Sequence, residues 1–214
     1  MQTHCIFVTG GTGYIGRPLI DRLIERGHAV RALARTASAA VLPASATRII
    51  GDALDPSTYA EGVAPADTFV HLVGTPHPNP AKAREFREVD LASIRAAIDA
   101  STRGRVTHFI YLSVAQPAPV MHAYIAVRQE GEALVRATGI PATILRPWYV
   151  LGPGHRWPAL LKPAYALFEM LPATRASARR LGLVTLEQMV AALTRAVEHP
   201  PERLRICEVP EIRA

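Results

Sequence analysis

Three glycines, Gly10, Gly13 and Gly16, follow a short apolar segment and open an amphipathic one. Residues 5–8 read as a buried strand, and the segment from Arg17 onward carries apolar residues at helical spacing. In a strand-to-helix turn, the first glycine permits a tight bend, the second lets the backbone approach a diphosphate, and the third lets helix pack on strand. The helix N-terminal amides then face the negative charge. The pattern predicts a dinucleotide-binding turn.

Strand-like and helix-like segments continue to alternate beyond this turn. The predicted strands are residues 28–34, 47–50, 68–73, 106–113 and 142–145, and the predicted long helices are residues 81–102 and 124–138. Such alternation predicts an α/β fold with a doubly wound parallel sheet of the Rossmann type, helices on both faces, and a ligand cleft at the carboxyl edge.

The 214 residues suit a single domain, with a core over 1–154 and a small C-terminal extension on the substrate side over 155–214. In the extension, the apolar stretch 157–171 is expected to line or cover a pocket, followed by a helix over 185–199 and a strand over 205–209. Peripheral contact with a membrane surface is an alternative role for 157–171, because arginines follow it.

The composition limits the compartment and the partners. With 49% hydrophobic and 20% charged residues and no apolar run of membrane-spanning length, we expect a cytoplasmic protein without a signal peptide, either monomer or homodimer. Cys5 and Cys207 lie in strand-like runs and favour buried thiols over a disulfide. The net charge of +6 comes from scattered basic residues, so no nucleic-acid partner is predicted.

The end of the second strand bears on the choice of cofactor. An NAD site places a carboxylate there for the ribose 2′-hydroxyl, but this chain has Ala34 followed by Arg35, with Arg31 on the same strand. A guanidinium can grip a 2′-phosphate in a bidentate way, so NADP is favoured over NAD. Arg31 as a solvent-facing strand residue stays open.

Other strand ends carry further candidates. Asp52 can accept a hydrogen bond from an adenine amino group, or it can be a turn aspartate that caps the helix near Pro56. Gly74 permits the backbone to pass close to a cofactor ribose. His71 and His77 have no nearby carboxylate or cysteine partner in the sequence, so no metal site is predicted.

Together these segments resemble the short-chain dehydrogenases/reductases, and specifically the extended and atypical branches related to nucleotide-sugar epimerases, isoflavone-type reductases and nitrogen-metabolite regulators. The matching segments are 9–16, Gly51-Asp52, the strand end at Ser113, Tyr124-x-x-x-Arg128, 144–147 and 152–154, with a weaker match at 184–190. The resemblance spans residues 5 to about 154.

The resemblance implies a full cofactor site. It places Thr12, Tyr14 and Ile15 by the pyrophosphate, Asp52 and Ala53 by the adenine, Val73, Gly74 and Thr75 by the ribose, and Pro147, Trp148 and Val150 by the nicotinamide.

The resemblance also implies catalytic roles. Ser113 would orient a carbonyl or hydroxyl group, and Tyr124 would exchange its proton as general acid or base. The family's lysine, four residues after the tyrosine, is Arg128 here. Residues four apart share a helix face, so Arg128 keeps a positive charge near Tyr124, although its bulk and fixed fork differ from an ammonium.

Two functions follow from these expectations. The first is an NADP(H)-dependent oxidoreductase acting on a small, largely apolar carbonyl or quinone-like compound, since the chain is short for a nucleotide-sugar site. The alternative, motivated by Arg128, is a redox sensor or assembly protein that binds NADP(H) without turnover.

Overall fold

The computed structural model describes residues 3–153, 177 and 179–214, and within this part seven strands form one parallel sheet in the order β3-β2-β1-β4-β5-β6-β9. The strands are β1 Cys5–Thr9, β2 Ala29–Ala34, β3 Thr47–Ile50, β4 Thr68–His71, β5 His108–Leu112, β6 Ala142–Arg146 and β9 Leu204–Glu208. The chain builds outward from β1 in one direction and then, from β4, in the other. Parallel sheets bind ligands at the carboxyl ends of strands where the order reverses this way.

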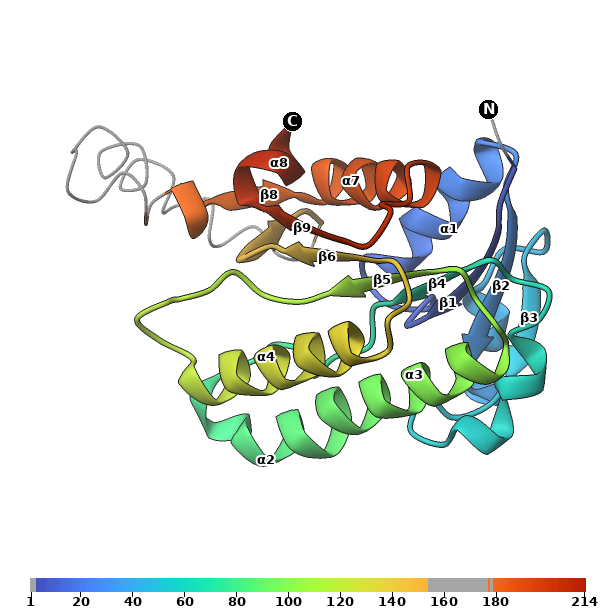
Figure 1. Ribbon diagram of the computed structural model, residues 1–214, viewed down its shortest axis with the longest axis horizontal. Coiled ribbons are helices and arrows are strands. Elements are labelled where there is room, and N and C mark those ends of the chain that lie inside the picture. The colour runs from blue at the N-terminus through green and yellow to red at the C-terminus, as the bar shows by residue number, and fades with distance from the viewer. Residues whose placement is uncertain (1–2, 154–176, 178) are drawn as a thin grey trace.

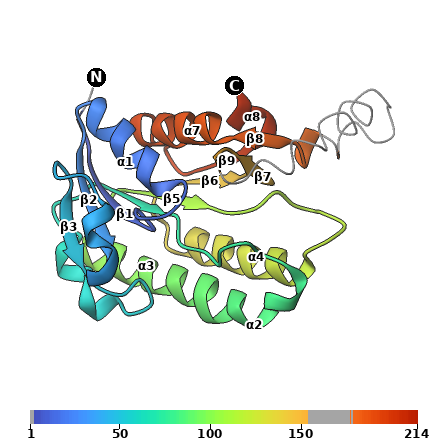
Figure 2. The same cartoon turned by 180° about the vertical axis from the view of Figure 1, so that it is seen from behind.

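Helices cover both faces of the sheet (Figures 1 and 2). On one face lie α1 Gly16–Glu25, α7 Leu186–Glu198 and α8 Val209–Arg213, and on the other lie α2 Ala83–Glu85, α3 Ala92–Arg103 and α4 His122–Ala137. The doubly wound α/β prediction is therefore confirmed.

Successive residues of the central strands enter different cores. Ile6 and Val8 pack toward α1 and α7, whereas Phe7 between them packs toward α3 and α4, and all three side chains are fully buried. Each such side chain contributes roughly 1.5–3 kcal/mol by burial. Two-sided burial explains why these strands read as continuous apolar runs rather than as alternating patterns.

Several local predictions need correction. The single helix predicted over 81–102 contains a π-helical segment, Phe86–Leu91, between α2 and α3. The helix expected near Pro56 is instead a pair of 3-10 turns, Pro56–Thr58 and Ala60–Gly62, and Asp55 rather than Asp52 caps the first of them. The sequence did not predict the small parallel pair β7 Tyr149–Leu151 and β8 Leu183–Thr185, nor α8.

The C-terminal predictions are partly testable. The last helix begins at its predicted cap, Thr185, which forms a capping box with Gln188. The stretch 157–171, with its predicted pocket-lining and membrane-surface roles, lies outside the described residues. Among the helices that are described, none combines the length and apolar character needed to cross a membrane.

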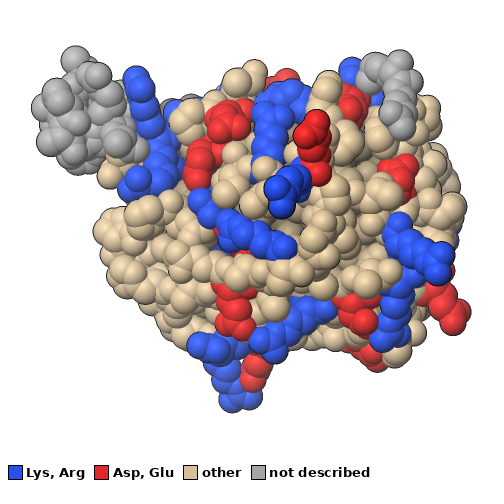
Figure 3. Space-filling model, in the orientation of Figure 1, with Lys and Arg blue, Asp and Glu red and all other residues tan. Residues whose placement is uncertain are grey.

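Two further predictions concern the cysteines and the surface charge. Cys5 and Cys207 are free thiols, and burial raises the pKa of each. On the face shown in Figure 3, basic side chains are interspersed with acidic ones rather than gathered into one basic stripe.

Candidate functional site

The glycine turn joins β1 to α1 through a compact hydrogen-bonded bend. Gly10 has a φ of +76°, and its carbonyl accepts a hydrogen bond from the Gly13 amide at 3.0 Å. A side chain at Gly16 would collide with the Gly10 carbonyl and with the Gly11 backbone. The first helical turn of α1 has no acidic residue and no side-chain cap at Ile15. The Arg17 amide donates to the Gly13 carbonyl at 3.2 Å and Pro18 has no N–H, so the amides of Ile15 and Gly16 are the ones left to face an anion. These features fit a dinucleotide diphosphate.

The end of β2 separates the two arginines considered for a 2′-phosphate. The Arg31 side chain donates to the Gly62 carbonyl at 2.8 Å and is thereby committed to the 3-10 turn Ala60–Gly62. Arg35 directly follows β2 and is exposed, and its side chain makes no hydrogen bond or ion pair with the part of the chain that is described.

The adenine-side candidate Asp52 is an exposed turn residue. Its carboxylate accepts the Leu54 amide at 3.0 Å, while Asp55 accepts from Ser57. Asp52 is thus engaged in its own turn and does not cap the following helix. Its remaining carboxylate oxygen is not committed to another described group.

A cavity of about 550 Å³ opens at the carboxyl edge, beside the glycine turn. The predicted residues that line it are Gly10, Gly13, Tyr14, Ile15, Gly16, Gly74, Thr75, Ser113, Tyr124, Arg128, Pro147, Trp148 and Val150. The predicted residues that do not line it are Thr12, Arg35, Asp52, Ala53 and Val73. The structure therefore brings the glycine turn and the predicted catalytic residues to one cavity, and leaves the adenine-side residues outside it.

The rest of the cavity wall is mostly apolar and includes strained backbone. Leu72, Leu112, Val114 and several prolines contribute apolar surface. His77 and Met121, on opposite loops, both line the cavity with positive φ angles of 49° and 62°. Such conformations in non-glycine residues concentrate at binding sites, where the surrounding structure holds them.

Arg128 does not extend into the cavity as a free cation. Its guanidinium is buried, donates to the Asp90 carboxylate at 2.6 Å and to the Leu112 carbonyl at 2.9 Å, and lies 5.1 Å from the centroid of the Tyr124 ring. Burial lowers the pKa of Arg128, but the neighbouring Tyr124, Tyr111 and Asp90 more than offset this, so the net shift is upward and the side chain stays charged.

Asp90 is the site residue that sequence reasoning missed. Its carboxylate is completely buried and also accepts both the amide of Thr75 at 3.0 Å and its hydroxyl at 2.6 Å. A side chain at Gly74 would collide with the Arg128 guanidinium, so this glycine makes room for the ion pair. Asp90 falls in the π-helical segment, a feature frequent at functional sites, and no local motif marks it.

Tyr124 lies beside the ion pair formed by Arg128 and Asp90. It lies in the first turns of α4, is half-buried, and packs its ring against Phe86 with centroids 4.9 Å apart. One face of the tyrosine thus meets the π-helical segment, and the phenol borders the cavity. The position suits a proton donor, and it also satisfies ordinary packing.

His71 connects the glycine turn to the Asp90 segment. Its Nδ1 lies 2.8 Å from the Thr9 hydroxyl, and its Nε2 lies 3.4 Å from the Ser93 hydroxyl. Because Ser93 donates its own proton to the Asp90 carbonyl, we assign the ring proton to Nε2 and the Thr9 proton to the hydrogen bond with Nδ1. Burial, and secondarily the charge of Arg128, lower the pKa of His71 from 6.5 to about 3. The ring is therefore neutral at physiological pH.

Ser113 lines the cavity, but its proton is already used. Its hydroxyl donates to the buried Glu132 carboxylate at 2.7 Å, which also accepts from Gln116, Arg136 and Arg146. Burial raises the pKa of Glu132, but the hydrogen bonds from Arg146 and Ser113 outweigh it and leave the pKa below its usual range. Only a lone pair of Ser113 remains for a ligand.

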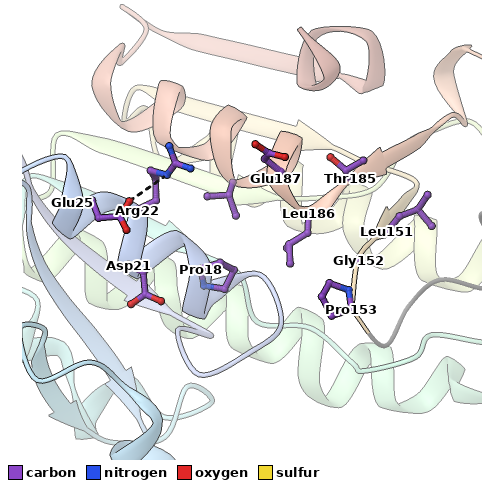
Figure 4. A pocket seen from close by; sticks show the side chains of 11 residues that line it. Pro18, Asp21, Arg22, Glu25, Leu151, Gly152, Pro153, Thr185, Leu186 and Glu187 are labelled. Atoms are coloured by element: carbon purple, nitrogen blue, oxygen red, sulfur yellow. Dashed lines mark ion pairs between the residues drawn. The ribbon is translucent and has the colours of Figure 1, made fainter.

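A second hollow of about 670 Å³ lies between α1 and the start of α7 (Figure 4). It is lined by carboxylates from Asp21, Glu25 and Glu187, and by Arg22, which pairs with Glu25 at 3.7 Å. None of the predicted catalytic residues borders it. Among the described residues, no group of three histidine, cysteine or acidic side chains is arranged to hold a metal ion.

Comparison with known proteins bears on the cofactor. Residues 10–157 match the family model described as NAD(P)H-binding. The chain belongs to this NAD(P)H-binding family. The predicted resemblance to the short-chain dehydrogenases/reductases is confirmed with it.

Curated relatives of this NAD(P)H-binding chain include reductases. A "4-hydroxy-2-methyl-3-oxo-4-farnesyl-3,4-dihydroquinoline-1-oxide ketoreductase" of Stigmatella aurantiaca is 28% identical over 68% of this chain and 50% of that protein. A "Ceramide reductase" of Caulobacter vibrioides is 27% identical over 97% of this chain and 65% of that protein. The chain thus spans between half and just under two thirds of these relatives.

Solved structures share the fold. A short-chain dehydrogenase/reductase superfamily protein from Agrobacterium tumefaciens with bound NAD superposes with a TM-score of 0.69 at 18% identity, covering 96% of this chain and 77% of that one. At this identity the likeness concerns the fold alone. The Rossmann prediction and nicotinamide-cofactor binding are confirmed, and the comparisons do not separate NADP from NAD.

Proposed function

We propose that this NAD(P)H-binding chain is an NADP(H)-dependent reductase of a small, largely apolar carbonyl or quinone-like compound. The observation that carries the proposal is the shared cavity, in which the glycine turn and the half-buried Tyr124 border one apolar space. A nicotinamide beside Pro147 to Val150 would leave the apolar walls for a substrate.

The residues present have distinct tasks in this proposal. The glycine turn and the α1 amides bind the diphosphate, Thr75 meets the ribose, and Arg35 takes the 2′-phosphate. A nicotinamide cofactor held by these residues would supply the hydride that the carbonyl carbon needs. Tyr124 gives its proton to the carbonyl oxygen, so ketone, reduced cofactor and one proton become alcohol and oxidised cofactor. Ser113 contributes at most as an acceptor, because its proton is held by Glu132.

Cofactor preference is tested by calorimetry with NADPH and NADH. Arg35→Ala should weaken NADPH binding by about tenfold or more while leaving NADH affinity nearly unchanged, because only NADPH carries the phosphate that Arg35 would grip. Arg31→Ala is the matched control on the same strand. If both variants lose both ligands equally, the assignment of Arg35 fails.

Turnover is tested with Tyr124→Phe. On a panel of aldehydes, ketones and quinones followed by nicotinamide absorbance, the variant should lose roughly 10²–10⁴-fold in kcat, with cofactor affinity retained, because a positioned acid contributes on that scale. Unchanged turnover would remove Tyr124 from the reaction.

A second function is supported by two observations. Arg128 is neutralised by Asp90, and the proton of Ser113 is committed to Glu132, so the site departs from the family's catalytic pattern in two places. A redox sensor or assembly protein that binds NADP(H) without turnover is the alternative. Calorimetric binding of NADP(H), together with no turnover of any carbonyl or quinone in the panel, would favour this alternative.

A further inference from the structure

We propose that Asp90 is a positioning residue: it converts Arg128 from a free cation into half of a neutral pair, so that Tyr124 keeps its proton until a substrate oxygen takes it. This inference rests on the proposed function, since it concerns the proton that Tyr124 would donate.

The geometry supplies the first argument. The Arg128 guanidinium and the Asp90 carboxylate meet at 2.6 Å with side-chain exposures of 5% and 0%. Water therefore screens neither charge, and each charge compensates the other at close range. An uncompensated guanidinium so close to a phenol ring would favour tyrosinate. Paired with the Asp90 carboxylate, the guanidinium forms a dipole that has no net charge.

The binding of Asp90 to Thr75 supplies the second argument. One carboxylate oxygen takes the Arg128 donor, and the other takes the amide and hydroxyl of Thr75. Asp90 therefore fixes two cavity-lining residues at once, one beneath the tyrosine and one in the loop after β4. A carboxylate is suited to this double task because it accepts on both oxygens.

Other titratable groups lie on the elements around this pair. Tyr111 on β5 lies under the same guanidinium, with its ring centroid 5.8 Å from the Arg128 carbon, and burial raises its pKa. His71 on β4 is neutral, and His77 lies across the cavity in the loop after β4. Lys82, beside the start of α4, pairs with Glu85 at 3.6 Å. Asp90 is thus the buried anion that balances Arg128.

The test is a spectroscopic titration of Asp90→Asn, with the tyrosinate signal of Tyr124 isolated by subtracting the same titration of a Tyr124→Phe background. Asparagine keeps the shape of Asp90 but removes its charge. The midpoint for Tyr124 should fall by about one pH unit or more relative to the parent protein, because the guanidinium is no longer balanced. If turnover is present, the pH profile of kcat should shift in the same direction.

Two controls separate charge from damage. Glu132→Gln removes an equally buried carboxylate two turns along α4 and should leave the Tyr124 midpoint in place. The double variant Asp90→Asn with Arg128→Met has no charge at the pair, so its midpoint should return to within about half a unit of the parent. If Asp90→Asn is too unstable to titrate, Arg128→Met alone replaces it: the unbalanced Asp90 carboxylate should raise the Tyr124 midpoint by about one unit or more, and an unchanged midpoint overturns the role of Asp90.

The outcomes distinguish this inference from the proposed function. A Tyr124 midpoint that is unchanged or raised in Asp90→Asn, or lowered by a unit or more in the double variant, overturns the role of Asp90. Absence of turnover across the substrate panel instead overturns the reductase, and the titration can still be read.

Discussion

Two buried arginine–carboxylate centres lie one turn apart on α4, and they are built differently. The first joins Arg128 of the helix to Asp90, and the second joins Glu132 of the helix to Arg146 of β6. Both helix residues are almost completely buried. The carboxylate of Glu132 is saturated, with donors on both oxygens. Each centre also holds one buried polar atom with no partner among the described residues, the Nε of Arg128 in the first and the Oε2 of Glu208, beside Arg146, in the second.

The difference teaches which centre serves the fold. The Glu132 centre ties α4 to the β5 loop through Ser113 and Gln116, and to β6 and β9 through Arg146, which also pairs with Glu208 at 2.9 Å. The guanidinium of the Arg128 centre borders the cavity, whereas the Glu132 centre reaches the cavity only through Ser113. The Glu132 centre therefore joins α4 to the sheet, and the Arg128 centre lies at the candidate site.

The largest expected effect comes from removing the saturated carboxylate of Glu132. Glu132→Ala should reduce the free energy of unfolding by about 4–5 kcal/mol, because it removes every acceptor of five hydrogen bonds and leaves Arg146 with Glu208 alone. Urea denaturation measures this. A loss below about 1 kcal/mol would mean that the centre contributes little to holding the sheet.

A smaller loss is expected at the other centre. Arg128→Met should cost about 3 kcal/mol, since methionine fills the stem volume and Asp90 keeps its two bonds to Thr75. Adding Asp90→Asn should restore about 1–2 kcal/mol, because the carboxylate left unpaired is removed. The check is a double-mutant cycle by urea denaturation. Strictly additive losses would show that the two residues do not act as a pair.

The two centres also show where prediction from sequence succeeds and where it stops. The strands, the helices and the glycine turn follow from apolar periodicity and local backbone needs, which are properties of neighbouring residues. Arg128 became a candidate through the family resemblance, because it stands four residues after Tyr124 where the family has a lysine. Its partner Asp90 is 38 residues earlier in the chain, on a π-helical segment that no local pattern announces. The same limit applies to Ser113, whose commitment to Glu132 arises only when α4 packs on β5.

The last effect is a pH dependence, small for any one pH unit, that sharpens the contrast, because the cavity-side centre has the buried His71 close to Arg128. The pKa of His71 is lowered from 6.5 to about 3. As pH falls below 6.5, His71 binds a proton in the unfolded chain but stays neutral in the folded protein. The stability contributed by neutral His71 is therefore present above that pH and is lost progressively toward pH 3.

His71→Gln should accordingly flatten the decline of the unfolding free energy by about 1.4 kcal/mol per pH unit across this window, even if the variant is less stable at neutral pH. The comparison is His108→Gln, because the pKa of His108 is also lowered by burial, but only to about 4. The unfolding free energies of the two variants should therefore show the same pH slope down to pH 4. Below pH 4 the slopes should differ, because His71 is still neutral in the folded protein whereas His108 becomes protonated. An acid slope in His71→Gln equal to that of the parent would show that the Thr9–His71–Ser93 connection accommodates the charged ring, and the tautomer assigned to it would then be wrong.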